Sequence, residues 1–159
     1  MVKVLAALGV IMLGVWAAFA RPQSGLPDGV WLAVDGERIV EIAACAPGSE
    51  VRCGTLVWLR TPTDGEGRPL RDDRNVDLAL QRRAICELQV LSAFKAGAEA
   101  GRWTGTIYVP DDGQTFQGTV MVEGDRLSVT HEINSPDATR SRIEVWTRVT
   151  KPFARCSPM

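Results

Sequence analysis

Short runs of residues that favour β-strands recur along the chain, and turn-forming residues separate them. Val, Ile, Leu, Trp and Thr dominate the runs, whereas Gly, Pro, Asp and Asn collect between them. This spacing predicts an all-β fold, in which an antiparallel meander closes or nearly closes into a barrel of about eight strands. The clearest predicted strands span residues 29–34, 37–43, 55–59, 102–109, 115–122, 126–133 and 142–149.

The residues between these runs predict how neighbouring strands are joined. Asp35-Gly36 predicts a hairpin with a type I′ turn, which requires a positive φ at both positions. Pro110-Asp111-Asp112-Gly113 predicts a second hairpin turn, with Gly113 in the left-handed conformation. The polar stretch NSPDATRS, residues 134–141, predicts a loop before the last strand. Consecutive strands are therefore expected to be antiparallel neighbours.

The segment from Asn75 to Phe94 has two interpretations. Asn75 is a suitable cap for a short helix over Val76–Arg83. The following AICELQVL either continues that helix or starts another strand. We therefore expect a short helix or an irregular segment near residues 76–94.

The first 20 residues have the composition of a secretory signal. Lys3 precedes an uncharged apolar run that ends in Ala18-Phe19-Ala20, a cleavage site of small residues. An uncleaved membrane anchor is the alternative, because the run approaches the length that spans a bilayer. No basic cluster follows the run, however. We expect cleavage after Ala20, no stable membrane anchor, and a single exported domain over residues 21–159.

The charge pattern argues against a nucleic-acid partner. The 159-residue chain has a formal net charge of −1. Arginines gather at positions 68, 71, 74, 82 and 83, but Asp72, Asp73 and Asp77 are interleaved with them. Such a mixture is typical of a solvated surface, so we expect no binding of nucleic acid.

All four cysteines lie after the predicted signal, and an oxidising compartment favours disulfides between them. Three pairings are open. Cys45–Cys53 is favoured, because these residues flank the turn-forming APGSEVR, and Cys86–Cys156 would then tie the C-terminal tail to the body. Zinc is disfavoured, since Cys-x-x-Cys does not occur and the single histidine, His131, is distant in sequence. We expect neither a metal nor a cofactor.

Familiar catalytic motifs do not occur in the sequence. It contains no Gly-x-Ser-x-Gly, phosphate-binding loop or dinucleotide fingerprint. Asp111-Asp112-Gly113 lacks the alternating ligands of a calcium loop. Asp72-Asp73 has no recognisable partner for acid/base chemistry. We expect no catalytic residues and favour a binding protein over an enzyme.

Candidates for ligand contact lie on the predicted strands. Leu127, Val129, His131 and Ile133 share one face of their strand, which places the histidine in the interior. There it is either a buried, hydrogen-bonded residue or a group that orients a ligand. Barrels of about eight strands hold at most one small ligand. The residues that we expect to line such a site, or alternatively to be plain core, are Trp58, Trp103, Tyr108 and His131.

Residues in the first and the last predicted strand resemble the lipocalin and calycin pattern. Gly29-Val30-Trp31 opens the first strand, and Arg148 lies in the last, within Trp146-Thr147-Arg148. The resemblance implies that the arginine covers the tryptophan. A guanidinium group on an indole face gains cation–π and packing energy. Gly29, Trp31 and Arg148 are therefore expected to be structural.

The chain after the signal also resembles the DUF2147 family of small exported bacterial proteins. Five stretches carry this resemblance in order: GVWLAVDGERIVEI, CGTLVWL, GRPLRDDRNVDLALQRRAI, GRWTGTIYVPDDGQTFQGTV and VWTR. It implies a lipocalin-like barrel, a periplasmic or secreted location and an unidentified small-molecule ligand. It supplies no catalytic residues.

Two functions follow as hypotheses. The first is a lipocalin-like protein of the cell envelope that binds a small, partly apolar molecule. The alternative is a non-enzymatic interaction module, an inhibitor or assembly factor, with an envelope protein as its partner. The second would act through the loop Arg60–Asn75 and the Cys45–Cys53 turn, because loops on a rigid scaffold carry function.

Overall fold

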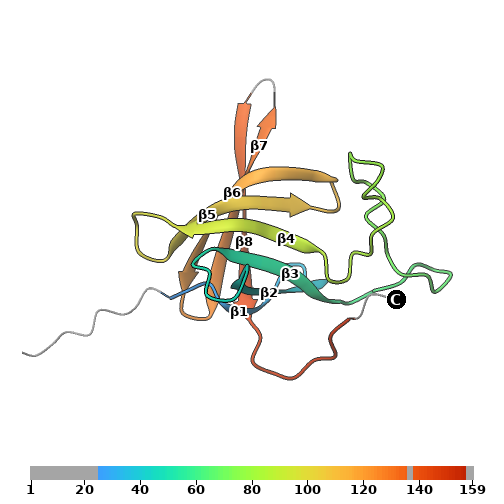
Figure 1. Ribbon diagram of the computed structural model, residues 1–159, viewed down its shortest axis with the longest axis horizontal. Helices are drawn as coiled ribbons and strands as arrows, with labels where there is room; N and C mark the ends of the chain where they lie inside the picture. Colours follow the sequence, from blue (N-terminus) through green and yellow to red (C-terminus); the bar gives the residue numbers. More distant parts are fainter. Residues whose placement is uncertain (1–24, 136–137, 157–159) are drawn as a thin grey trace, which may run out of the picture.

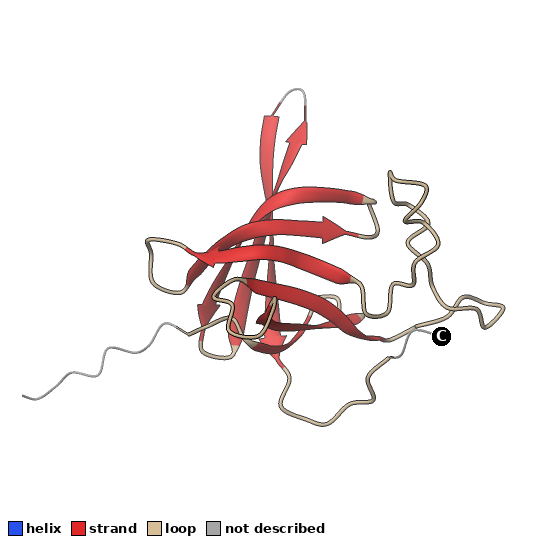
Figure 2. Cartoon of the chain, in the orientation of Figure 1, coloured by secondary structure: helices blue, strands red, loops and turns tan. Residues whose placement is uncertain are grey.

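The computed structural model describes residues 25–135 and 138–156, and its eight strands form one closed antiparallel barrel (Figure 1 and Figure 2). Each strand pairs with the next along the chain, and β1 pairs with β8 to complete the barrel. The predicted all-β barrel is confirmed. Its strands are β1 (Gly29–Leu32), β2 (Arg38–Ala44), β3 (Arg52–Leu59), β4 (Gln89–Ala96), β5 (Arg102–Val109), β6 (Gln114–Glu123), β7 (Arg126–Ser135) and β8 (Ala138–Arg148).

The ambiguous segment is irregular up to Leu88 and then forms β4. The Asn75 side chain accepts a hydrogen bond from the Asp77 amide at 2.8 Å, and the Asp77 side chain accepts one from the Ala79 amide at 2.9 Å. These local turns occupy amide groups that would otherwise belong to a helix. The helical alternative is therefore wrong. The described ranges contain no helix, and hence no helix long and apolar enough to cross a membrane.

Two predicted connections differ from the structure. Gly36 has a φ of +70°, but Asp35 is not left-handed, so the β1–β2 hairpin does not have the predicted type I′ turn. The Asp35 carboxylate instead accepts a hydrogen bond from the Glu37 amide at 2.9 Å. The predicted loop 134–141 is also too long, because backbone pairing of β7 with β8 continues to Ser135 and Ala138. This β7–β8 ribbon projects beyond the other strands (Figure 1).

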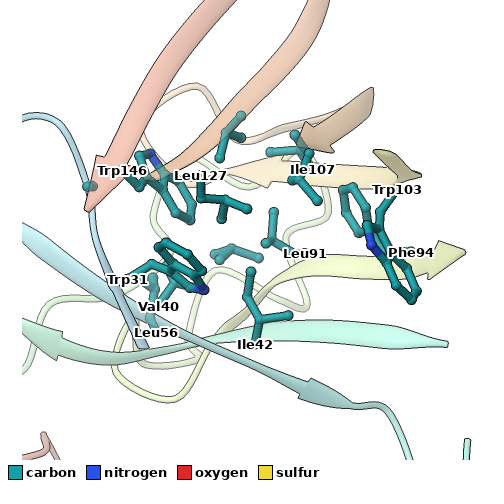
Figure 3. Packing of buried hydrophobic residues seen from close by; sticks show 14 of the residues in the cluster. Trp31, Val40, Ile42, Leu56, Leu91, Phe94, Trp103, Ile107, Leu127 and Trp146 are labelled. Atoms are coloured by element: carbon teal, nitrogen blue, oxygen red, sulfur yellow. The ribbon is translucent and has the colours of Figure 1, made fainter. Parts of the chain in front are cut away.

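Apolar side chains fill much of the barrel interior (Figure 3). Trp31, Leu127 and Val40 are fully buried, and Figure 3 shows Phe94 and Trp103 on the opposite side of the view from Trp31 and Trp146. Inward glycines make room for large neighbours. A Cβ atom on Gly118 would lie 2.3 Å from Ile107 Cδ1, so any side chain there would force Ile107 to move. The packing is therefore dense where these glycines lie.

The meander places alternate connections at opposite ends of the barrel. The β2–β3, β4–β5 and β6–β7 turns lie at one end, which we call the closed end. The β1–β2, β5–β6 and β7–β8 turns and the long β3–β4 loop, residues 60–88, lie at the other, which we call the open end. The two ends differ in how their charged residues are used.

Candidate functional site

The closed end is covered by an arginine. The guanidinium carbon of Arg148 lies 4.1 Å from the centroid of the Trp31 ring. Trp31 Nε1 donates a hydrogen bond to the Pro27 carbonyl at 2.8 Å, and Arg148 donates to the Asp28 carbonyl at 3.1 Å. Gly29 has a φ of +131°, and a Cβ atom there would lie 2.4 Å from Arg148. These contacts are of the kind expected if Gly29, Trp31 and Arg148 have structural roles.

A second arginine lies on a tryptophan at the same end. Arg52 is 9% exposed, pairs with Asp28 at 2.5 Å, and has its guanidinium carbon 5.7 Å from the Trp103 ring centroid. Trp103 belongs to the packed cluster and does not line the cavity described below. Its indole is therefore part of the closed end.

Both favoured disulfides are present. Cys45–Cys53 closes the β2–β3 turn at the closed end, with a Cα–Cα distance of 4.9 Å. In the other bridge, Cys86–Cys156, the Cα–Cα distance is 5.9 Å. The latter bridge joins the end of the β3–β4 loop to the C-terminal tail. The Cys156 amide donates a hydrogen bond to the Val57 carbonyl at 2.9 Å, and Arg155 pairs with Glu41. The tail is thus fastened along the outside of β2 and β3.

A cavity of about 130 Å³ lies inside the open end of the barrel. Its inner wall is aliphatic and aromatic, and its mouth is charged. Strands β2 to β5, β7 and β8 and the β5–β6 turn contribute to it. The apolar lining residues include Val40, Leu56, Val90, Leu91, Ile107, Val129 and Trp146, and the polar ones are Asp35, Arg38, Asp111, Asp112, His131, Arg142 and Glu144, with Tyr108 at the wall.

His131 is the buried polar residue of this cavity. Its position on β7 places it on the inward face with Leu127 and Val129, and it is 5% exposed. Its ring centroid lies 5.3 Å from that of Phe116. Burial lowers the pKa of His131, against the fields of Glu144 and Asp112, which raise it; Arg142 lowers it further. The imidazole is therefore held neutral beside the mouth.

Ion pairs connect the turns around the mouth. Arg38 on β2 pairs with Asp35 at 3.1 Å and with Asp111 of the β5–β6 turn at 2.8 Å. Burial lowers the pKa of Arg38, but the hydrogen bond and charge of Asp111, with those of Asp35, outweigh it and raise the pKa above its ordinary value. On β8, Arg142 pairs with Glu144 at 3.2 Å. The mouth is thus bordered by paired charges.

Tyr108 serves mainly to hold the β3–β4 loop. Tyr108 follows the inward Ile107 on β5; part of the residue lines the cavity wall, whereas its hydroxyl reaches the β3–β4 loop. Its hydroxyl donates to Asp72 Oδ1 at 2.5 Å, and it accepts from Asn75 Nδ2 at 2.8 Å. Arg83 pairs with Asp72 at 2.7 Å. Burial, followed by the hydrogen bond to Asp72, raises the pKa of Tyr108.

This loop also packs on the β5–β6 turn. Arg74 donates a hydrogen bond to the Asp111 carbonyl at 2.6 Å. A Cβ atom on Gly113 would overlap the Arg74 carbonyl oxygen, at 1.7 Å, and Gly113 has a φ of +67°. The predicted left-handed Gly113 is confirmed. The loop therefore has a fixed position beside the mouth.

Outside the interior cavity, the same loop borders a groove of about 440 Å³. The groove shares Arg38, Leu56, Pro110 and Asp111 with the cavity, so the two spaces adjoin at the Arg38–Asp111 ion pair. The remaining lining comes from β2, β3 and the loop: Glu37, Leu59, Thr61, Leu70, Arg71, Asp73, Arg74 and Ile85.

Trp58 lies apart from the other predicted ligand contacts. Regular alternation would place it on the same face as Leu56. A bulge at Val57, however, pairs Val40 with Leu56 and Ile39 with Trp58. Because cross-strand partners share a face, Trp58 lies on the outer face with Ile39. Of the four predicted residues, the cavity is therefore lined by His131 and Tyr108, and not by Trp58 or Trp103.

Sequence reasoning did not find the charged mouth or the role of Asp72. Asp72 is 1% exposed and binds Asn75, Arg83 and Tyr108. The charge pattern placed it on a solvated surface, which is wrong for this carboxylate, and the only other role considered for it was acid/base chemistry. The separation of 36 residues between Asp72 and Tyr108 gives no local signal in a single sequence. Among the described residues, no three His, Cys, Asp or Glu side chains are grouped to hold a metal ion.

Comparisons with known proteins agree with this architecture. Among solved structures, the chain is similar to protein HP1028 from Helicobacter pylori, which is described as belonging to the lipocalin family. The sequence identity is 16%, the TM-score is 0.59, and the likeness covers 77% of this chain and 82% of that chain. At this identity, the likeness shows the fold alone.

Sequence comparison identifies the family. No curated protein matches this sequence. The family model "Uncharacterized protein conserved in bacteria (DUF2147)" matches residues 29–148, which span all eight strands. The chain therefore belongs to the DUF2147 family of bacterial proteins and has a lipocalin-like barrel.

Proposed function

We propose that this protein binds one small, partly apolar molecule in the cavity at the open end. The observation that carries the proposal is the cavity itself, which combines an aliphatic inner wall with a polar mouth and a buried His131. This combination is typical of small-molecule sites, in which apolar contacts supply affinity and a few polar groups fix orientation. Binding is favoured over catalysis because the lining contains no nucleophile paired with a base.

The size of the cavity limits the ligand. A dry cavity of about 150 Å³ accommodates a benzene molecule, and the interior cavity here measures about 130 Å³. Drug-sized ligands usually occupy about 300 Å³ or more. The inner space therefore fits a single ring or a short branched chain. A larger ligand would place its remainder past Arg38 and Asp111 in the adjoining groove.

We also propose that the protein is exported. Membership of a bacterial family and two disulfides are consistent with an oxidising compartment. The predicted signal and its cleavage after Ala20 lie outside the described residues. The proposed location is the periplasm or the exterior, with no membrane anchor after cleavage.

Mass spectrometry of the protein exported with its own leader tests both proposals. The denatured, non-reduced protein is expected to begin at Arg21 and to be four hydrogen atoms lighter than the reduced chain, because two disulfides are formed. Under native conditions, an additional mass should be present and should leave on denaturation. A native mass that equals the bare chain, together with no uptake of single-ring compounds, would contradict ligand binding.

A second candidate function is protein interaction through the β3–β4 loop. Val76 and Leu78 are 80% and 76% exposed at its tip, whereas Asp72 and Asn75 hold its base. Exposed apolar side chains on a fixed loop are typical of a contact surface for another protein. This contact surface lies just beyond the segment Arg60–Asn75 expected from sequence.

A paired substitution tests the second candidate. Val76→Ser with Leu78→Ser should abolish capture of an envelope protein from extract, while the thermal midpoint remains unchanged. Ile143→Ser is the matched control, since Ile143 is 65% exposed on β8, away from the loop. Equal capture by all three proteins would exclude the loop tip as the contact.

A further inference from the structure

We propose that the cavity selects a ligand with a positive charge, namely a small apolar body that carries a protonated amine. This inference rests on the proposed function, because it specifies the class of molecule that enters the same cavity. Its first support is the charge of the mouth. Four carboxylates face two guanidinium groups, which leaves a formal charge of −2 with a neutral imidazole. These groups are Asp35, Asp111, Asp112 and Glu144, then Arg38 and Arg142, and His131.

Both guanidinium groups already have carboxylate partners. Arg38 binds Asp35 and Asp111, and Arg142 binds Glu144. Within the described part of the chain, Asp112 forms no ion pair. An anionic ligand would have to displace a carboxylate to reach either arginine. A cationic ligand meets unbalanced negative charge without breaking an existing pair.

Trp146 and Glu144 supply the second support. Trp146 is 6% exposed and lines the cavity. Its Nε1 donates a hydrogen bond to Glu144 Oε2 at 3.0 Å, which keeps a carboxylate next to the indole. An ammonium group near an indole gains cation–π energy, and the adjacent carboxylate adds a charge-assisted hydrogen bond. Tryptophan and carboxylate together are the groups that alkylammonium ligands prefer.

His131 supplies the third support. Two of the three charges that act on it, Glu144 and Asp112, favour a positive charge at its position, and Arg142 opposes it. Burial nevertheless keeps the imidazole neutral. A neutral imidazole has one nitrogen with a free lone pair, which accepts a hydrogen bond from an ammonium group. Because the imidazole stays neutral, the positive charge that Glu144 and Asp112 favour at this place would be supplied by the ligand.

Three compounds of nearly equal size separate charge from shape. Benzylamine is a cation, benzyl alcohol is neutral, and benzoate is an anion near neutral pH; each has the single ring that fits the inner space. Binding to the exported, disulfide-bonded protein is measured by calorimetry and by amide chemical shifts at low ionic strength, where charge effects are largest. Benzylamine is expected to bind about tenfold more tightly than benzyl alcohol, and benzoate more weakly than both.

Substitution of one carboxylate tests the cause of this preference. Glu144→Gln keeps the shape of the side chain and should remove most of the advantage of benzylamine over benzyl alcohol. Glu123→Gln is the matched control, because Glu123 is an exposed carboxylate at the closed end of β6. Asp112→Asn, on the exposed β5–β6 turn, replaces the first variant if Glu144→Gln does not fold.

The outcomes distinguish this inference from the function on which it rests. If benzyl alcohol or benzoate binds as tightly as benzylamine, the charge preference is wrong, whereas the proposed ligand site remains. If Glu144→Gln and Asp112→Asn leave the ratio unchanged, the mouth carboxylates are not its cause and the inference is also wrong. If none of the three compounds binds, the site and its charge preference are both refuted.

Discussion

The two ends of the barrel use the same kinds of residue in opposite ways. At the closed end, Arg148 lies on Trp31 and Arg52 lies near Trp103, so each guanidinium group covers an indole. At the open end, Arg38 and Arg142 pair with carboxylates around a cavity that Trp146 lines. Arginine and tryptophan therefore close one end of the barrel and border a cavity at the other.

This difference follows from what fills the barrel. The fully buried side chains Trp31, Leu127 and Phe94 occupy the packed cluster, where inward glycines leave room for large neighbours. Towards the open end, Val90 and Val129 are small, and His131 stands where an apolar residue would complete the packing. The closed end thus supplies stability, and the open end has the space that binding requires.

Loss of the closed-end tryptophan should have the largest effect. Trp31→Ala removes a fully buried indole and the surface on which Arg148 lies. We expect the free energy of unfolding to fall by about 3–5 kcal/mol, measured by chemical denaturation. Trp58→Ala is the control, because Trp58 is half-buried on the outer face. An equal loss of unfolding free energy in both variants would show that the closed end does not contribute more to stability than the outer face.

Loss of Asp72 should weaken the open end without opening the barrel. Asp72→Ala leaves Arg83, Asn75 and Tyr108 without their shared acceptor. A cost of about 1–3 kcal/mol is expected, with faster amide exchange in the β3–β4 loop than in the strands. The exposed neighbour gives the control: Asp73→Ala should change stability by less than about 0.5 kcal/mol. Uniformly faster exchange across all strands would argue against a local anchor.

Enlarging one valine at each end compares the two directly. Val122→Phe adds volume to the packed cluster and should cost about 1–3 kcal/mol. Val129 belongs to the same cluster but also lines the cavity, so Val129→Phe has space to enter and should cost less while it excludes the ligand. Denaturation and benzylamine titration measure the two effects. Continued binding by the Val129 variant would place the ligand elsewhere.

Local patterns were sufficient to predict most of the barrel. Alternation places Leu127, Val129 and His131 on the inward face, and turn residues mark the hairpins at Asp35-Gly36 and Pro110–Gly113. These signals are carried by neighbouring residues, so one sequence contains them. Both disulfides could also be predicted, since Cys45 and Cys53 flank one turn and leave one pair.

The candidate site depends on contacts that local patterns do not contain. The bulge at Val57 reverses the direction of Trp58, and nothing in TLVWL marks it. Arg38 meets Asp111 across 73 residues of chain, and Asp72 meets Tyr108 across 36. Such pairs come together only in the folded barrel, so the order of residues in one sequence does not indicate them. For this reason His131 was identified as a candidate from the sequence, whereas the charged mouth around it was not.

The smallest expected effect concerns His131 and the pH dependence of stability. Burial holds the pKa of His131 below its ordinary value of 6.5, despite the opposing fields of Glu144 and Asp112. As the pH falls through 6.5, the unfolded chain takes up this proton before the folded protein does. The free energy of unfolding should therefore decrease between about pH 7 and the lowered pKa, and this contribution should level off below it. His131→Gln should lack this component.

Thermal midpoints of the wild type and His131→Gln between about pH 7 and pH 5 measure the difference, in a range above the titration of most carboxylates. A bound amine should enlarge the effect, because it needs the neutral imidazole as an acceptor and protonation of His131 would repel it. If the plots of thermal midpoint against pH are parallel for the two proteins, with and without benzylamine, His131 only packs in the barrel interior and does not contact the ligand. A divergence that grows with benzylamine would instead make this histidine the point at which the open end responds to its ligand.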